Sequence, residues 1–155
     1  MAAYDSSTFN PDISVGYLAK RVHQASRVGL EPAFAGEDIG YVQWAALVSI
    51  WYGGRGTTCK AVARDLAYDR GATTRLLDTL EERGLIERER DPEDRRSINL
   101  TLTAAGHAIA ERCMIRVVDL WNGWLAGWDQ ADVARLIGYL QRLRGELEAA
   151  TEDKS

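Results

Sequence analysis

The segment 57–102 constrains the fold of this chain more than any other part of its sequence, because its apolar residues change from helical to alternating spacing. Its first part, CKAVARDLA, predicts a short helix that Thr57 or Thr58 can cap and in which Val62 and Leu66 point inward. The letters YDRG that follow are typical of a turn. A second helix must therefore begin shortly after this turn if the apolar pattern is to continue.

The rest of the segment predicts that helix and then a β-hairpin. The helix, ATTRLLDTLEERG, carries Leu76, Leu77 and Leu80 as its apolar residues and ends at Gly84. The stretches LIERER and SINLTL read as strands, and the charged turn DPEDRR joins them. The order helix, turn, helix, strand, charged tip, strand is that of a winged helix-turn-helix. We therefore expect a mainly α fold with a small β-hairpin wing.

This order of elements suits double-stranded DNA. The second helix of such a pair fits the major groove, with its N-terminal residues at the base edges. Arg can form two hydrogen bonds with guanine, Thr can bond a base or touch a thymine methyl, and Asp can accept from cytosine. Arg95 and Arg96, at the tip of the hairpin, can reach phosphates or a narrow minor groove.

The run TTRLLDTLEERGLIERERDPEDRRSINLTLTAAG resembles the MarR family of bacterial regulators. It carries the recognition-helix frame TRLLDxLE, then GLIxR, the wing DPxDRR and finally LTxxG. The resemblance implies that Arg96 enters the minor groove and that Asp94 orients it. It also implies a homodimer held by the N-terminal and C-terminal helices. The YDRG turn departs from the Leu-Ser or Leu-Asp turn of many relatives, which leaves the bases that are read open.

The expected DNA contacts come from the start of the first short helix, the recognition helix and the hairpin. They are Thr58, Lys60, Asp69, Arg70, Ala72, Thr73, Thr74, Arg75, Arg88, Asp94, Arg95 and Arg96. We expect Lys60 to contribute affinity without sequence preference, and Arg70 and Arg75 to carry the base preference.

Helices are expected on both sides of this segment. Residues 12–30 have helical apolar spacing, and a second helix over 38–52, with Asp38 as its N-cap, ends at a glycine-rich turn. A long helix follows from Thr103 to about Gly127.

The last helix begins at Asp129, and its apolar residues recur nearly as heptads, which suits packing between two subunits. These residues are Val133, Leu136, Ile137, Leu140, Leu143 and Leu147. Residues 1–10 read as a flexible tail, and 11–155 as a single MarR-like domain. Its winged helix-turn-helix spans 57–102, flanked by dimerisation helices over 11–36 and 107–150.

The net charge of −4 does not favour a nucleic-acid partner by itself. Its distribution matters more than its sum. The segment 55–96 holds ten basic and ten acidic residues, so the excess of acidic residues lies outside the expected DNA-binding segment, which we call the reading head. Charge alone fits a solvated surface as well as a DNA-binding one, and the motif decides between them.

All five Trp residues lie outside the segment 52–120. The interpretation we favour for them is packing in the core and between subunits. The alternative is an aromatic lining for a planar ligand, because members of the resembled family bind small aromatic or phenolic effectors between the dimer helices and the DNA-binding lobe. The ligand-binding residues would then be His23, Trp44, Trp51 and Trp121.

Other chemistry finds little support in the sequence. Cys59 and Cys113 have no C-x-x-C spacing, and they are more typical of tolerated thiols than of oxidant sensors. His23 and His107 lack clustered metal-ligating partners. We expect no catalytic residues, no metal and no cofactor. The first residues lack the basic start and apolar stretch of a secretion signal, and no apolar run is long enough to span a membrane. We therefore expect a cytoplasmic protein.

These observations predict a sequence-specific double-stranded-DNA-binding transcriptional regulator, not an enzyme. We expect a homodimer on a pseudo-palindromic operator, and a repressor that a small-molecule effector releases. The alternative is a winged-helix module for protein–protein contact without a DNA target. The arginines at the hairpin tip and on the recognition helix favour the first function.

Overall fold

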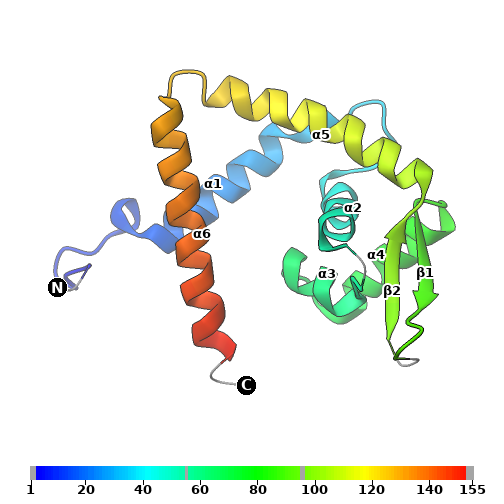
Figure 1. The fold of residues 1–155 in the computed structure, drawn as a ribbon. Coiled ribbons are helices and arrows are strands. Elements are labelled where there is room, and N and C mark those ends of the chain that lie inside the picture. The colour runs from blue at the N-terminus through cyan, green and yellow to red at the C-terminus, as the bar shows by residue number, and fades with distance from the viewer. Residues whose placement is uncertain (1–2, 55, 95–96, 153–155) are drawn as a thin grey trace. The chain divides into compact units, whose positions relative to one another are not determined.

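The computed structural model describes residues 3–54, 56–94 and 97–152, and it is mainly helical with one two-stranded antiparallel sheet (Figure 1). The elements in chain order are η1 (Pro11–Ile13), α1 (Val15–Gly29), η2 (Glu31–Phe34), α2 (Tyr41–Gly53), α3 (Cys59–Leu66), α4 (Arg70–Glu82), β1 (Ile86–Arg90), β2 (Ile98–Leu102), α5 (Ala104–Trp124) and α6 (Gln130–Glu152). The expected winged helix-turn-helix is therefore present as α3, α4, β1 and β2.

The two short helices begin at side-chain caps. The Thr58 hydroxyl accepts a hydrogen bond from the Ala61 amide at 3.3 Å, and the Asp69 carboxylate accepts one from the Ala72 amide at 2.9 Å. Because Asp69 is the cap, α4 begins at Arg70, so the predicted turn over 68–71 is shorter than expected. Gly84, at φ 65°, adopts the left-handed conformation that commonly follows a helix end.

The prediction that Asp38 caps the second helix is wrong. That helix begins at Tyr41, its N-cap is Gly40, and the Gly40 amide donates to Oε1 of Gln43 at 3.0 Å. Gly40 has an extended backbone, and Ile39, just before it, is buried. Asp38 instead lies 3.1 Å from a guanidinium nitrogen of Arg83.

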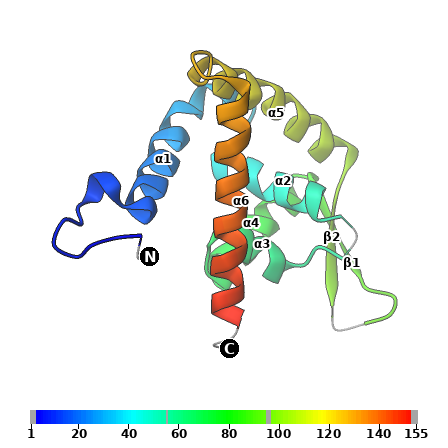
Figure 2. The same ribbon diagram turned by 60° about the vertical axis from the view of Figure 1, so that its left-hand side comes forward.

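The core of the reading head forms where α2, α3, α4 and the hairpin meet (Figures 1 and 2). Its largest fully buried side chains are Leu47, Val62, Thr73, Leu77, Leu80, Ile86 and Leu100. Cys113, on α5, is fully buried as well. The hairpin joins this core through its backbone as well, because the Leu100 amide donates to the Thr57 carbonyl at 2.8 Å. Wing and helices therefore share one interior.

The start of α5 is fastened to the junction between α4 and β1. The Thr103 amide donates to the Leu85 carbonyl at 3.1 Å, and the Thr103 hydroxyl donates to the Gly84 carbonyl at 2.7 Å. Gly106 passes so close to Leu85 that a Cβ at this position would overlap its carbonyl oxygen. This approach requires glycine.

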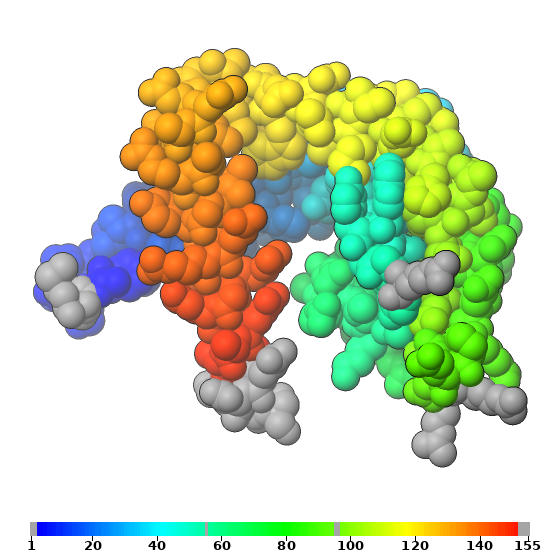
Figure 3. Space-filling model, in the orientation of Figure 1, coloured from blue at the N-terminus to red at the C-terminus, as the bar shows by residue number. Residues whose placement is uncertain are grey.

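Within the described residues, the chain divides into two compact units, residues 3–117 and 118–152. The second unit contains the last turns of α5 and all of α6. Side chains of α6 are exposed along its length, as its orange to red surface in Figure 3 shows. Among the helices of the described ranges, none is long and apolar enough to cross a membrane.

Candidate nucleic-acid interface and ligand pocket

The first turns of α4 carry both exposed and buried members of the predicted contact set. Arg70, Thr74 and Arg75 are exposed, whereas Thr73 is fully buried and its hydroxyl donates to the Asp69 carbonyl at 2.9 Å. Thr73 lies four residues before Leu77, so both side chains share the inward face of the helix. The prediction that Thr73 contacts DNA is therefore wrong, and the spacing to Leu77 already contained the signal.

The guanidinium groups of Arg70 and Arg75 form no ion pair with any carboxylate of residues 3–54, 56–94 and 97–152. The charge of Arg75 nevertheless affects the ionisation of Asp69. The pKa of Asp69 is lowered mainly by the hydrogen bond from the Ala72 amide, with a smaller contribution from the positive charge of Arg75. The start of α4 thus presents two cationic side chains beside an ionised cap.

Arg88 connects the hairpin to α4. Its Nη1 atom lies 2.7 Å from Oδ1 of Asp78 and 3.0 Å from Oε2 of Glu81, and only 26% of its side chain is exposed. A DNA phosphate would have to compete with these two carboxylates. The geometry gives Arg88 a clear role in holding β1 against α4, and its contact with DNA stays a prediction.

The start of α3 lies beside α4. Lys60 is exposed, and the Cys59 sulfur lies 3.9 Å from the Thr74 hydroxyl, so the two helix N-termini are neighbours. Thr58 uses its hydroxyl as the helix cap and is only partly exposed. A surface formed by both helix N-termini can contact phosphates through backbone N–H groups as well as side chains.

The wing turn is organised by a residue that the sequence reasoning missed. Oδ1 of Asp91 accepts hydrogen bonds from the amides of Glu93 and Asp94, at 2.8 and 3.1 Å, and its Oδ2 accepts one from Nδ2 of Asn99 at 2.9 Å. These hydrogen bonds, of which that from Asn99 has the largest effect, lower the pKa of Asp91. Arg95 and Arg96, the predicted minor-groove residues, lie outside the described residues.

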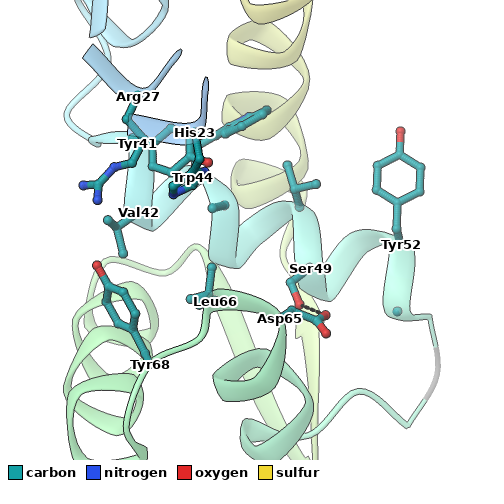
Figure 4. Close-up of a pocket in the computed structure, with 13 residues that line it drawn as sticks. His23, Arg27, Tyr41, Val42, Trp44, Ser49, Tyr52, Asp65, Leu66 and Tyr68 are labelled. Carbon is teal, nitrogen blue, oxygen red and sulfur yellow. Dashed lines mark hydrogen bonds between the residues drawn. The ribbon is translucent and has the colours of Figure 1, made fainter. Parts of the chain in front are cut away.

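A cavity of about 530 Å³ lies between α1, α2 and α3 (Figure 4). Its lining comprises His23, Arg27, Tyr41, Val42, Trp44, Ala45, Val48, Ser49, Tyr52, Gly53, Asp65, Leu66 and Tyr68. Two of the four predicted ligand-binding residues, His23 and Trp44, are thus brought together.

The other two predicted ligand-binding residues lie elsewhere. Trp51 does not line the cavity; like Trp44, whose Nε1 donates to the Ala110 carbonyl, it contacts α5, where its ring meets His107 edge to face at 5.0 Å. The α2 residues beyond Trp44 that line the cavity include Val48 and Tyr52. Trp121 belongs to the second unit, where it packs edge to face against Trp124 at 5.0 Å.

The cavity carries opposite charges on different walls. Arg27, from α1, lies over the Tyr41 ring with its Cζ 5.3 Å from the ring centre. Asp65, from α3, accepts a hydrogen bond from the Ser49 hydroxyl at 2.7 Å, and Figure 4 shows this pair well away from Arg27. None of these four residues was predicted from the sequence, because only the fold brings α1 and α3 together.

The two cysteine thiols lie in different surroundings. Cys113 is fully buried, and burial raises the pKa of its thiol. Cys59 is partly exposed. Within the described part of the chain, no three His, Cys, Asp or Glu side chains gather as a metal ion would require.

Comparison with known proteins is consistent with this geometry. The profile of the MarR family matches residues 39–98. Over 108 residues the chain is 37% identical to the multiple antibiotic resistance protein MarR of Salmonella typhimurium, covering 70% of this chain and 74% of that protein.

Solved structures resemble most of the chain. Wild-type MarR from E. coli in its apo form is 31% identical, with a TM-score of 0.72 over 84% of this chain and 96% of that one. The PcaV transcriptional regulator from Streptomyces coelicolor, solved with its natural ligand, is 27% identical, with a TM-score of 0.67 over 94% and 98% of the two chains.

Proposed function

The chain belongs to the MarR family, and on that premise we propose that it is a transcriptional regulator that binds specific sequences in double-stranded DNA. The observation that carries this proposal is the start of α4, where Arg70, Thr74 and Arg75 are exposed together beside the start of α3. Placed in a major groove, these side chains would face base edges, and Lys60 would face the phosphates.

Selection of bound sequences from random duplex DNA tests this proposal. The wild-type protein should enrich one pseudo-palindromic sequence, and its affinity should fall steeply with salt because phosphate contacts release counterions. Arg70→Ala and Arg75→Ala should each relax the preference at one base pair of each half-site, by about 1–3 kcal/mol.

Two control variants make the selection specific. Lys60→Ala should weaken binding evenly across sequences, and Arg135→Ala, on α6, should change nothing. If the protein neither enriches a sequence nor binds heparin in a salt-dependent way, the DNA-binding proposal fails. The winged helix would then be better explained as a protein–protein module.

We further propose that the regulator is a homodimer. Exposed apolar side chains follow both terminal helices, which is unusual for helices that face only water. On α1 and just before it they include Ile13, Val15, Tyr17, Leu18 and Val22, and on α6 they include Leu136, Ile137, Leu140 and Leu147. A second copy of the chain would cover these faces and supply the second half-site contact.

The cavity between α1, α2 and α3 supports the proposal of a small-molecule effector that releases the operator. Its walls are aromatic and its volume suits a small planar molecule. PcaV, which shares the fold, was solved with its natural ligand. Trp44 also has a structural role. Its ring contacts Phe34 and Tyr41, and its Nε1 donates to the Ala110 carbonyl at 3.2 Å.

A panel of aromatic acids and neutral phenols tests the effector proposal. A ligand of this cavity should quench Trp fluorescence and lower operator affinity together, because only differential affinity for the two states can shift the equilibrium. Arg27→Ala should weaken binding of the acid more than that of the matched phenol. If no compound changes either signal, the Trp residues are better explained as packing.

A further inference from the structure

The wing turn is held by the side chain of its first residue. One carboxylate oxygen of Asp91, Oδ1, accepts from the amides of Glu93 and Asp94, and the other, Oδ2, accepts from Nδ2 of Asn99. Two backbone bonds close the same turn, from the Asp91 amide to the Ser97 carbonyl at 3.0 Å and from the Ser97 amide to the Asp94 carbonyl at 2.8 Å. Asp91 is therefore the common acceptor for both sides of the turn.

Asn99 connects this turn to the start of α3. It pairs with Glu89 within the hairpin, and its backbone also forms an isolated antiparallel bridge with Thr58, the N-cap of α3. The next residue, Leu100, donates its amide to the Thr57 carbonyl at 2.8 Å. One residue of β2 thus contacts the wing turn through its side chain and the first DNA-facing helix through its backbone.

The polar side chain of Asn99 has one unfavourable feature in the hairpin. Its Oδ1 is buried and has no hydrogen-bond partner in the described structure. A buried acceptor without a partner is destabilising. The bond from Nδ2 to Asp91 is the favourable interaction that the amide provides here.

We propose that Asp91 and Asn99 form a positioning pair that fixes the wing turn relative to the start of α3, so that wing and recognition helix meet DNA as one preformed surface. The inference rests on the proposed DNA-binding function. A wing fixed before binding loses less conformational entropy on the duplex than a mobile one, which raises affinity without any direct contact by either residue.

The arrangement of donors allows a test by exchange of the two side chains. Asn99→Asp sets two carboxylates against each other, and Asn99→Leu removes the donor without adding charge. The double change Asp91→Asn with Asn99→Asp restores the pair in reverse. The amide oxygen then at position 91 can keep both backbone bonds, while the amide nitrogen donates to the carboxylate at position 99. Thr101→Val, on the same strand, is the matched control.

Two measurements are made on each variant. The first is hydrogen exchange at the Glu93 and Asp94 amides, and the second is affinity and its salt dependence on the duplex that wild-type protein selects. We expect Asn99→Leu to speed exchange at both amides and to weaken binding about tenfold, with a shallower salt slope and an unchanged thermal midpoint of the helices. The exchanged pair should recover most of both losses, and Thr101→Val should match wild type.

The outcomes separate this inference from the proposed function. If the wild type selects a duplex and Asn99→Leu binds it equally well, the pair does not position the wing for DNA. If the exchange rates of Glu93 and Asp94 are unchanged in Asn99→Leu, the pair does not hold the turn, whatever the DNA result. If the wild type selects no duplex, the proposed function fails and the positioning role for DNA fails with it.

Discussion

Thr73 and Thr74 are adjacent in α4, yet the helix turns them to opposite surroundings. The Thr73 side chain is fully buried and bonds the Asp69 carbonyl, whereas Thr74 is exposed and bonds the Arg70 carbonyl at 2.8 Å. Each hydroxyl bonds the carbonyl four residues earlier, as helical threonines can. The first residue belongs to the core and the second to the candidate interface.

Thr73→Val should separate these two roles. The valine has nearly the same shape but loses the hydrogen bond to Asp69, so we expect the free energy of unfolding in urea to fall by about 1 kcal/mol. The base preference found by selection should stay as in wild type. Thr74→Val is the matched variant, and there we expect little change in stability and an altered base preference. A change of base preference in Thr73→Val with no change in stability would contradict the burial of this residue.

Three carboxylates should make the protein sensitive to acid. The pKa of Glu37 is lowered, first by its hydrogen bond from Arg112, that of Asp69 by the Ala72 amide, and that of Asp91 by Asn99. A carboxylate with a lowered pKa stabilises the folded state above its ordinary pKa, which is 3.8 for Asp and 4.5 for Glu, and loses this contribution as pH falls through the folded value.

Stability in urea should therefore fall as the pH drops below about 4.5. Glu37→Gln removes one of these groups, so its stability should be lower than that of wild type at pH 7 but should decline less on acidification. Urea midpoints measured from pH 7 to pH 3 check this. Parallel profiles for the two proteins would show that Glu37 does not contribute to the acid response.

At the scale of elements, ion pairs set how neighbouring elements meet. Arg88 joins β1 to α4 through Asp78 and Glu81. Glu37 joins the loop before α2 to α5 through Arg112 and Arg116, at 2.8 and 3.3 Å, and Arg116 also donates to the Ala33 and Ala35 carbonyls. Each cluster therefore links two elements through side chains with opposite charges.

Arg88→Ala should loosen the wing from the recognition helix. It leaves Asp78 and Glu81 three residues apart on one helix without their shared cation, so we expect a loss of about 1 kcal/mol in unfolding free energy and a smaller effect at high salt. Arg88→Lys should recover part of the loss, since lysine restores the charge without the planar fork. Equal stability of Arg88→Ala and wild type at low salt would show that the cluster does not hold this junction.

The sequence predicted the elements well where local chemistry decides them. A cap at Thr57 or Thr58, Gly84 after α4 and a strand in the stretch SINLTL are each determined by residues a few positions apart, and the structure confirms them, with Thr58 as the cap. The burial of β2 does not alternate, however, because Ile98 is exposed. The start of α2 was misplaced: the helix begins at Tyr41, and Ile39 before it is buried, a tertiary environment that the local pattern does not specify.

The candidate sites were less predictable than the elements. Whether Arg88 faces DNA or the carboxylates of α4 depends on the packing of a strand against a helix. Arg27 and Asp65 line one cavity only because α1 and α3 fold together. The Asp91–Asn99 pair depends on the register of the hairpin, which no local pattern in the sequence specifies.

At the scale of the whole molecule, the proposed dimer depends on the exposed apolar face of α6. Leu140→Asp places a charge on that face, beside Leu136 and Ile137. We expect this variant to sediment as a monomer. Its affinity for the operator should be greatly reduced, because a monomer contacts only one half-site. Ala149→Asp, on the opposite side of the same helix, is the control and should stay dimeric. A Leu140→Asp protein that remains a dimer with full operator affinity would contradict this interface.

The junction of α4, β1 and α5 has a mechanical consequence. Thr103 bonds the carbonyls of Gly84 and Leu85, and Gly106 packs its backbone directly on Leu85. No flexible linker separates the first turn of α5 from the end of the recognition helix. A rotation imposed on the first turn of α5 is therefore passed directly to the end of α4 and the start of β1 through these contacts.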